Sequence, residues 1–391
     1  MDMQFCLRER GSHGHADTSF LSVEQAKQAE AFHRTLPGYE VTPLVMLDNL
    51  AQRLGVGAVY LKDESKRFGL NAFKALGGSW AIAGYLKQAL GLTEDVTLDT
   101  LHAALADRAP ITFITATDGN HGRGVAWTAR VLGQKAVVYM PKGSAAERLE
   151  NIRAQGAQAE ITEYNYDDTV RIAAADGEKH GWVLVQDTAW PGYETIPTAI
   201  VQGYSTLALE LDAQLEQMGE DLPTHVFLQA GVGSFAGAVL GYLREKYRER
   251  CPVTVIVEPD RADCLYRSAV ADDGERRIVT GDMDTIMAGL ACGEPCTVTW
   301  PLINAYADGF VSCLDEVAAQ GMRLLGRPEG DDPVVVSGES GAVGAGVLAG
   351  LMSGDYEQER RALGLDEHSR VLLISTEGDT DRENYRKIVF G

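Results

Sequence analysis

Short apolar runs alternate with longer amphipathic segments along most of this 391-residue chain. The short runs are bounded by polar or glycine-rich turns and predict buried strands, and the longer segments predict helices. Regular alternation of the two predicts an α/β fold with parallel sheets covered by helices, in which ligands bind beyond the carboxyl ends of the strands. The predicted strands are 58–62, 111–115, 135–140, 156–161, 182–186, 225–229, 254–258 and 371–376.

Composition narrows the class of protein. There are 56 Asp and Glu against 35 Lys and Arg, a net charge of −21, which argues against nucleic acid or an anionic membrane as a partner. No apolar run reaches the roughly 18 residues of a membrane span, and we expect a cytoplasmic protein. The six cysteines have neither CxxC spacing nor a neighbouring histidine pair, so we expect no metal site.

Glycine is over-represented, with 42 residues against a typical share of roughly 7%. Many of these glycines gather at 69–78, 119–124, 231–237 and 338–346, where they follow predicted strands or open predicted helices. These loops are therefore the first places to look for a site.

Lys74 lies in the segment NAFKALGG, at the first turn of the helix predicted from Phe73. The positive end of the helix dipole and partial burial both favour the uncharged amine, which is the nucleophilic form that makes a Schiff base. Phe73 and the glycine pair indicate packed surroundings. An ordinary surface lysine is the alternative.

The loop ATDGNHGRG, at 116–124, connects the strand 111–115 to a helix. Backbone N–H groups at such a helix start can bind an anion such as a carboxylate. Asp118 is a candidate base, and the Asn120 amide a donor to a phenolate oxygen. Either residue is equally suited to capping the helix, and His121 alone is more typical of a packed histidine.

The segment QAGVGSFAG, at 229–237, follows the strand 225–229 and opens a helix, which is the arrangement of a phosphate cradle. It also resembles a dinucleotide fingerprint, because Glu258, 21 positions after Gly237, ends the next strand near the place of a ribose-binding acid. A NAD-dependent dehydrogenase is therefore an open alternative.

The segment LISTEGDTD, at 373–381, ends the last predicted strand. A hydroxyl of Ser375 or Thr376 is placed to hydrogen-bond a ring nitrogen, although a helix N-cap is the simpler interpretation. A second glycine loop, SGESGA at 337–342, precedes a helix of small residues and is either a further wall of the site or a close helix contact.

Together, NAFKALGG, ATDGNHGRG, QAGVGSFAG and ISTEGDTD occur in the order found in pyridoxal-phosphate enzymes of the tryptophan synthase β-subunit fold type, fold-type II. With QDTAWPGY at 186–193, the chain most resembles the diaminopropionate ammonia-lyase family over roughly residues 35–385. The resemblance implies a homodimer of two-lobed chains with three-layer α/β architecture. It also implies a large cofactor-binding domain, 1–84 and 193–391, and a smaller α/β domain, 85–192, that carries the DGNHG loop.

The resemblance also implies roles for individual residues. Lys74 matches the Schiff-base lysine, Asn120 the partner of the cofactor's phenolic oxygen, and Ser375 or Thr376 the hydroxyl that faces the pyridine nitrogen. The implied cofactor-binding residues are Phe73, Lys74, Asn120, Gly231, Val232, Gly233, Ser234, Ser375 and Thr376, and the implied substrate-binding residues are Thr117, Asp118, Gly119, His121 and Asp187.

Asp118 departs from related threonine and serine dehydratases, which usually have a small residue there. A carboxylate at this position adds a second base to Lys74, on the opposite face of the substrate, and Asp187 is placed to hold a cationic leaving group. We therefore expect pyridoxal-phosphate-dependent elimination of D- and L-2,3-diaminopropionate to pyruvate and ammonia, a step of amino-acid catabolism. An L-threonine or L-serine dehydratase is the nearest alternative, followed by a β-replacing synthase and a binding protein without activity.

Overall fold

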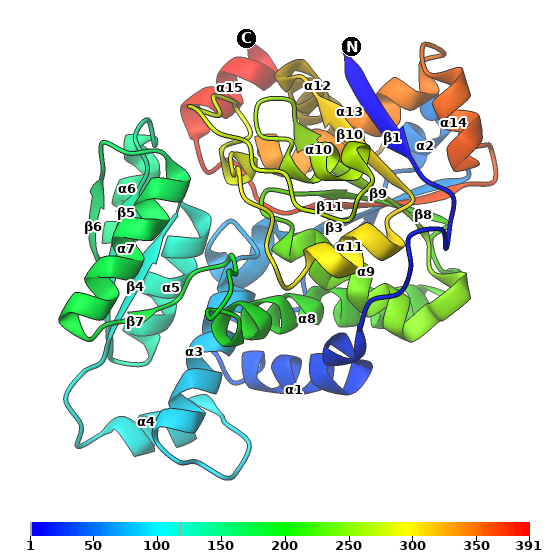
Figure 1. Cartoon of the computed structure of the whole chain (residues 1–391). Coiled ribbons are helices and arrows are strands. Elements are labelled where there is room, and N and C mark those ends of the chain that lie inside the picture. Colours follow the sequence, from blue (N-terminus) through cyan, green and yellow to red (C-terminus); the bar gives the residue numbers. More distant parts are fainter. Residues whose placement is uncertain (1, 118) are drawn as a thin grey trace.

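Two sheets lie side by side in the computed structural model, which describes residues 2–117 and 119–391 (Figure 1). Within these residues the large sheet has the strand order β1-β10-β9-β8-β11-β3-β2, and the small sheet the order β6-β5-β4-β7. The strands are β1 Met3–Leu7, β2 Leu44–Met46, β3 Ala58–Asp63, β4 Thr112–Ala116, β5 Lys135–Met140, β6 Gln158–Ile161, β7 Val183–Leu184, β8 His225–Gln229, β9 Val253–Pro259, β10 Gly309–Cys313 and β11 Arg370–Ser375.

The small sheet is parallel, as predicted, and so is the centre of the large one, but both edges of the large sheet are antiparallel. The edge strands β1 and β2, and the parallel strand β10 next to β1, were not predicted. β2 has three residues and β1 mixes polar with apolar side chains, so neither forms the apolar run typical of a buried strand. The predicted parallel, helix-covered sheets are therefore confirmed, and the large sheet carries one additional antiparallel strand at each edge.

Each central strand of the large sheet buries side chains on both faces. In β8, Val226 and Leu228 belong to one core, whereas Phe227 belongs to the other. The first core contains residues of α1, α8 and α9, and the second contains residues of α12 and α13, so helices cover both faces. These helices are α1 Val23–His33, α8 Thr195–Met218, α9 Ser234–Tyr247, α12 Asp315–Gly326 and α13 Glu339–Met352.

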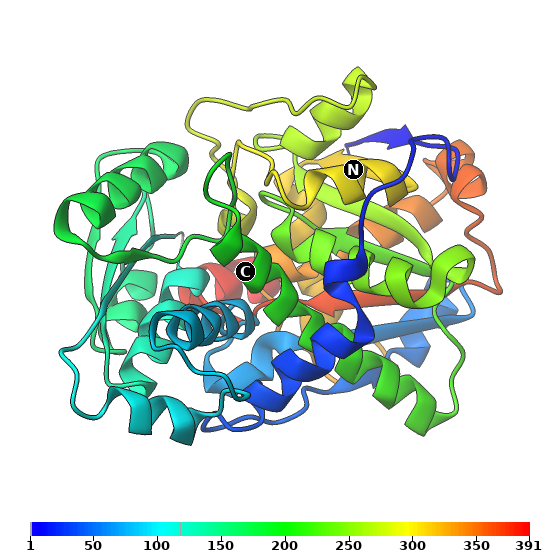
Figure 2. The same cartoon turned by 60° about the horizontal axis from the view of Figure 1, so that its bottom comes forward.

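Helices α5 and α6 cover one face of the small sheet, and α7 covers the other. The two lobes lie beside each other in both views (Figures 1 and 2). The strands of the small sheet lie between residues 112 and 184, inside the predicted small domain, but the exact boundaries 85 and 192 stay a prediction. Its helices are α5 Asn120–Val131, α6 Ala146–Arg153 and α7 Tyr166–His180.

The other helices complete the two lobes. Among the described residues, none of the helices is both long and apolar enough to cross a bilayer. These helices are α2 Asp48–Leu54, α3 Ala75–Ala89, α4 Leu98–Leu105, α10 Cys264–Ala271, α11 Trp300–Tyr306, α14 Glu357–Leu363 and α15 Arg382–Phe390, with 3₁₀ turns at Ser19–Leu21, Glu64–Gly69, Arg248–Arg250 and Ala288–Leu290.

Helix α3 packs against both α5 and α8, and glycines set these contacts. A Cβ atom on Gly124 of α5 would lie 2.9 Å from the Ala75 Cα atom, and one on Gly203 of α8 would lie 2.5 Å from the Leu76 carbonyl oxygen. Because backbone atoms cannot give way as side chains do, only glycine permits this spacing. The start of α3 is therefore fixed against both neighbouring helices.

A fully buried charge cluster joins β3 and the 3₁₀ turn after it to α8. Glu210 accepts hydrogen bonds from Lys62 at 2.9 Å and from Arg67 at 2.7 Å, and Arg67 also pairs with Glu64 at 2.8 Å. Two cations face two carboxylates, so the cluster carries no net charge. Burial raises the pKa of Glu210, but its hydrogen bonds with Arg67 and the positive charges of Arg67 and Lys62 lower it to about 2.

Replacing Glu210 by Gln should lower the free energy of unfolding by about 3–5 kcal/mol, because two buried cations lose a shared carboxylate. Chemical denaturation measures this loss. The difference from the unsubstituted protein should shrink as the pH falls below about 4.5 towards about 2, where the native carboxylate takes up a proton.

The matched control is Glu329→Gln, which removes the exposed Arg53–Glu329 ion pair and should change stability by less than about 1 kcal/mol. Equal effects of the two substitutions would contradict the importance of the buried cluster.

Candidate functional site

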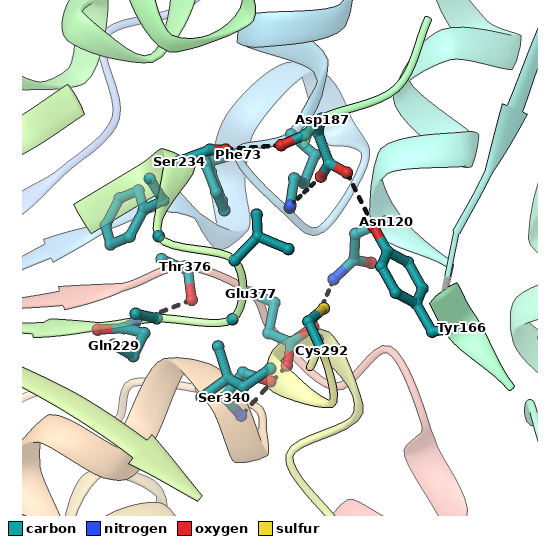
Figure 3. Close-up of a pocket in the computed structure, with 18 residues that line it drawn as sticks. Phe73, Asn120, Tyr166, Asp187, Gln229, Ser234, Cys292, Ser340, Thr376 and Glu377 are labelled. Carbon is teal, nitrogen blue, oxygen red and sulfur yellow. Dashed lines mark hydrogen bonds and ion pairs between the residues drawn. The ribbon is translucent and has the colours of Figure 1, made fainter. Parts of the chain in front are cut away.

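A cavity lies at the carboxyl ends of β8 and β11 and is lined from both lobes (Figure 3). This is the sheet edge where the sequence predicts ligand binding. Residues of the α3 start, the α5 start, the loop after β7 and the glycine loop after β8 face one another here. The lining includes Phe73, Lys74, Asn120, Tyr166, Asp187, Gln229, Gly231, Val232, Gly233, Ser234, Cys292, Ser340, Thr376 and Glu377.

Lys74 and Asp187 form an ion pair across the cavity, with the Lys74 Nζ atom 2.5 Å from the Asp187 Oδ2 atom. Lys74 immediately precedes α3, which begins two residues later than predicted, and its side chain lies near the rings of Phe73 and Tyr204. Asp187 follows β7 of the small sheet. Its side chain is nearly buried and also accepts a hydrogen bond from Tyr166 at 3.2 Å.

Asp187 is ionised despite its burial. Burial by itself raises the pKa of Asp187. The opposite effects are larger: the charges of His121 and Lys74, and the hydrogen bonds from Lys74 and Tyr166, lower the pKa well below its ordinary value. Burial also lowers the pKa of His121, while the charge of Asp187 opposes this shift. Lys74 makes the direct contact with the Asp187 carboxylate, at 2.5 Å, and His121 lies farther away, at 3.9 Å.

The glycine loop after β8 forms an open cradle at the start of α9. Gly233 has φ +95°, a backbone conformation that favours glycine, and a Cβ on Gly231 would lie 3.2 Å from the Cys292 Sγ atom. The first-turn N–H groups of a helix have no acceptor within the helix, so this loop presents several donors and the positive end of α9 to one anion. The Ser234 hydroxyl donates to the Asp187 backbone oxygen at 2.6 Å, which joins the cradle to the small lobe.

Asn120 reaches the cavity from the start of α5. Its Nδ2 atom lies 2.5 Å from the Glu377 Oε2 atom, across the boundary between the lobes. Glu377 follows β11, is buried, and accepts the Ser340 backbone N–H at 3.3 Å. Because a carboxylate accepts hydrogen bonds and cannot donate them, the Asn120 amide must turn its nitrogen towards Glu377.

Of the two hydroxyls predicted to face a ring nitrogen, the structure brings Thr376 to the cavity and not Ser375. Ser375 is the last residue of β11, and its hydroxyl is fully buried and donates to the Ser337 hydroxyl at 2.8 Å. Successive side chains of an extended chain point to opposite sides, so the two cannot both face the ligand. The assignment of Ser375 to the cofactor is therefore corrected.

Three other predicted substrate-binding residues do not line the cavity. The Thr117 hydroxyl accepts the N–H groups of Gly119 and Gly122 at 2.9 and 3.1 Å, so it caps the start of α5. Gly119 is the backbone turn before that helix. His121 is bonded through Nε2 to the Val185 carbonyl at 2.7 Å and lies behind Asp187, with Nδ1 3.9 Å from its Oδ2 atom. Asp118 lies outside the described residues.

Glu258, the candidate ribose-binding acid, is fully buried away from the cavity. Its carboxyl oxygens accept the N–H groups of Leu265 and Tyr266 at 2.9 and 2.6 Å, in the first turn of α10. Burial raises its pKa well above the ordinary value. Its carboxyl group is committed to capping a helix, which removes the acid that the dinucleotide interpretation requires.

Five residues that line the cavity were not singled out from the sequence, although three of them lie in segments that were: Tyr166, Gln229, Cys292, Ser340 and Glu377. Gln229 ends β8 and Glu377 follows β11 by one residue, so the rule that strand ends carry ligands would have found both. Ser340 opens α13 in the quoted loop 337–342. Nothing in the sequence marks Tyr166 or Cys292, which enter the cavity from the start of α7 and from the loop after the turn at Ala288–Leu290.

The lining fits a planar ring that carries a phosphate group and an aldehyde. The cradle offers amide donors to the phosphate, and Gly231 and Gly233 leave open the space that Cβ atoms would fill. Lys74 offers an amine, Asn120 an amide and Thr376 a hydroxyl at separate points around the cavity. This is the donor set that pyridoxal phosphate requires.

Comparison with known proteins agrees with this donor set. The family model of pyridoxal-phosphate dependent enzymes matches residues 35–377. Diaminopropionate ammonia-lyase of Escherichia coli K12 is 54% identical over 374 residues, 94% of this chain and 92% of that protein. The crystal structure of the Escherichia coli diaminopropionate ammonia-lyase in complex with D-serine has a TM-score of 0.92 at 49% identity, and covers 100% of this chain and 97% of that one.

A more distant relative represents the nearest alternative. The biosynthetic L-threonine dehydratase of Escherichia coli K12 is 27% identical over 322 residues, 81% of this chain and 53% of that protein. The likeness to the ammonia-lyase thus extends over nearly the full length of both proteins, and the likeness to the dehydratase does not.

Replacing Gly233 by Ala should weaken the binding of pyridoxal phosphate about tenfold, because the new Cβ strains a left-handed backbone and meets the Ile303 side chain at 3.0 Å. Gly156→Ala is the matched control, with φ +86° and no atom within 4 Å. It should reduce stability similarly and leave binding unchanged. Titration of the cofactor-free protein by visible absorbance measures the affinity, and equal weakening in both variants would contradict the cradle.

Proposed function

The chain belongs to the family of pyridoxal-phosphate-dependent enzymes, and we propose that it is an ammonia-lyase that converts D- and L-2,3-diaminopropionate to pyruvate and ammonia. The family match covers most of the chain, and the curated relative at 54% identity is a diaminopropionate ammonia-lyase. The related structure in complex with D-serine supports a site that admits the D-configuration.

The contact between Lys74 and Asp187 carries the choice of substrate. Asp187 is a nearly buried carboxylate that already holds one ammonium at 2.5 Å in this structure. When Lys74 is engaged with the cofactor, the same carboxylate is placed to hold the distal ammonium of the substrate. A hydroxyl leaving group, as in threonine or serine, is neutral and does not balance a buried carboxylate.

Several cavity residues would bind different groups of the cofactor. When bound, pyridoxal phosphate supplies an aldehyde carbon that takes up amines and a ring that withdraws electrons. The backbone N–H groups of 231–234 would hold its phosphate, Asn120 would donate to its phenolic oxygen, and Thr376 would hydrogen-bond its ring nitrogen. The Lys74 amine would attach to its aldehyde carbon and, once released from it, would act as a base.

Two bases that act from opposite faces of the substrate would allow both enantiomers to react. We infer that Lys74 takes the α-proton of the L-isomer and Asp118 that of the D-isomer. The electron pair of the Cα–H bond forms the Cα–Cβ double bond, and the Cβ–N bond breaks to release ammonia. The released enamine takes up water and gives pyruvate and a second ammonia.

The quaternary state and the location are also part of the proposal. Fold-type II enzymes usually form dimers, and we propose a homodimer that acts in the cytoplasm on a small amino acid as its substrate. The charge of −21 supports the absence of nucleic-acid and anionic-membrane partners.

Lys74→Ala should remove the visible absorbance of the bound cofactor and lower turnover of both enantiomers by about a thousandfold or more. Absorbance spectra and a 2-oxo acid assay measure the two effects. Lys66→Ala, an exposed lysine eight positions earlier, is the control and should change neither. Retained absorbance in Lys74→Ala would disprove the lysine assignment.

Asp118→Asn should lower turnover of D-2,3-diaminopropionate about a hundredfold and that of the L-isomer less than about fivefold, because only the D-isomer loses its base. Asp99→Asn, on the exposed side of α4, is the control. Equal losses with the two enantiomers would contradict the two-face arrangement. Threonine turnover as fast as that of diaminopropionate, in the same assay, would instead support the dehydratase.

A further inference from the structure

Gln229 is a buried amide beside the ring-nitrogen end of the cavity. It is the last residue of β8, and its side chain is 2% exposed. Its Nε2 atom lies 2.8 Å from the Ile374 carbonyl oxygen. The same atom lies 2.9 Å from the Thr376 hydroxyl oxygen (Figure 3). One amide nitrogen therefore donates hydrogen bonds to two oxygen atoms at the end of β11 and just beyond it.

These two contacts fix the orientation of the Gln229 amide. A carbonyl oxygen has no proton to give, so the atom of Gln229 that faces Ile374 must be the nitrogen. That nitrogen has two N–H groups. One is used by the Ile374 carbonyl, and the other is donated to the Thr376 hydroxyl oxygen.

The direction of the Thr376 hydroxyl follows from that of Gln229. Because its oxygen accepts from Gln229, its own proton must go elsewhere. Within residues 2–117 and 119–391, the hydrogen bond that this hydroxyl accepts from Gln229 is the one it makes with a protein atom, and it donates to none. Thr376 lines the cavity, so its proton points into it.

We propose that Gln229 is a positioning residue that makes the Thr376 hydroxyl a hydrogen-bond donor to the ring nitrogen of the cofactor, which therefore keeps its lone pair. This inference rests on the proposed function. Gln229 does not touch the reacting atoms and acts through Thr376 alone.

An unprotonated ring nitrogen affects where the electron pair of the broken Cα–H bond goes. A ring nitrogen without a proton withdraws electrons less strongly than a protonated one. The pair therefore moves to the Cα–Cβ bond and expels the β-amino group instead of remaining beside the ring. Elimination is favoured over reactions that need a long-lived carbanion.

A double-mutant cycle tests whether Gln229 acts through Thr376. Gln229→Met keeps the length of the side chain and removes its N–H groups, and Thr376→Val removes the hydroxyl. With Thr376 present, Gln229→Met should weaken cofactor binding about fivefold, the effect of one ordinary hydrogen bond. In the Thr376→Val background the same change should cost less than about twofold. Gln229→Met also removes the hydrogen bond to the Ile374 carbonyl. The loss of cofactor binding from that change is the same in both backgrounds and therefore cancels.

A second measurement reports the ring nitrogen directly and does not depend on activity. Enzyme loaded with ¹⁵N-labelled pyridoxal phosphate should show the ¹⁵N chemical shift of an unprotonated pyridine. Gln229→Glu places an acceptor beside Thr376, which turns the hydroxyl's lone pair to the ring, so the signal should move to the protonated range. Gln202→Glu is the matched control, because Gln202 donates to the Phe20 carbonyl at 3.0 Å and does not line the cavity. It should leave the shift unchanged.

Equal losses in both backgrounds of the cycle, or a protonated nitrogen in the unsubstituted enzyme, would overturn this inference alone. A protein that takes up no pyridoxal phosphate at all would overturn the proposed function and this inference together.

Discussion

The contact between the Lys74 ammonium and the Asp187 carboxylate holds the arrangement of the site together. Lys74 stands at the start of a helix of the large lobe, and Asp187 lies three residues after a strand of the small lobe, so one ion pair sets the distance between these two segments. Both charges are largely removed from water, and each is tolerated only because the other is present. The hydrogen bonds from Tyr166 to the carboxylate and from Ser234 to the same residue's backbone oxygen depend on this placement.

The chain handles charge in two different ways. Its surplus of 21 negative charges is spread over the whole molecule, whereas the buried cluster of Lys62, Glu64, Arg67 and Glu210 is balanced. The cradle at 231–234 faces the same problem for a ligand, since a phosphate group must enter a protein that repels anions overall. Backbone dipoles at the start of α9 act over a few ångströms, where the global field is screened by salt.

Sequence reasoning was most successful where one physical signal dominates. Apolar runs located the parallel strands other than β10, with β5 and β8 predicted to the residue, and glycine after a strand located the cradle. It failed where the outcome depends on the partner across a sheet or cavity. The short edge strand β2 exists because β3 is beside it, and Glu258 looked like a ligand-binding acid until its helix-capping contacts were known. The choice between Ser375 and Thr376 needed the direction of two adjacent side chains. The entry of Tyr166 into the cavity needed the fold itself.

The glycine contacts of α3 have a consequence for how this protein can change over generations. Gly124 and Gly203 touch no ligand, yet a single methyl group at either position would push backbone against backbone at the base of the helix that begins with Lys74. Such a change would displace the lysine while leaving every cavity residue in the sequence intact. In a survey of variants selected for growth, these two positions would therefore be as intolerant of substitution as the cavity itself. Without the structure, these two glycines would be mistaken for residues that bind the substrate or cofactor, whereas they act through helix packing.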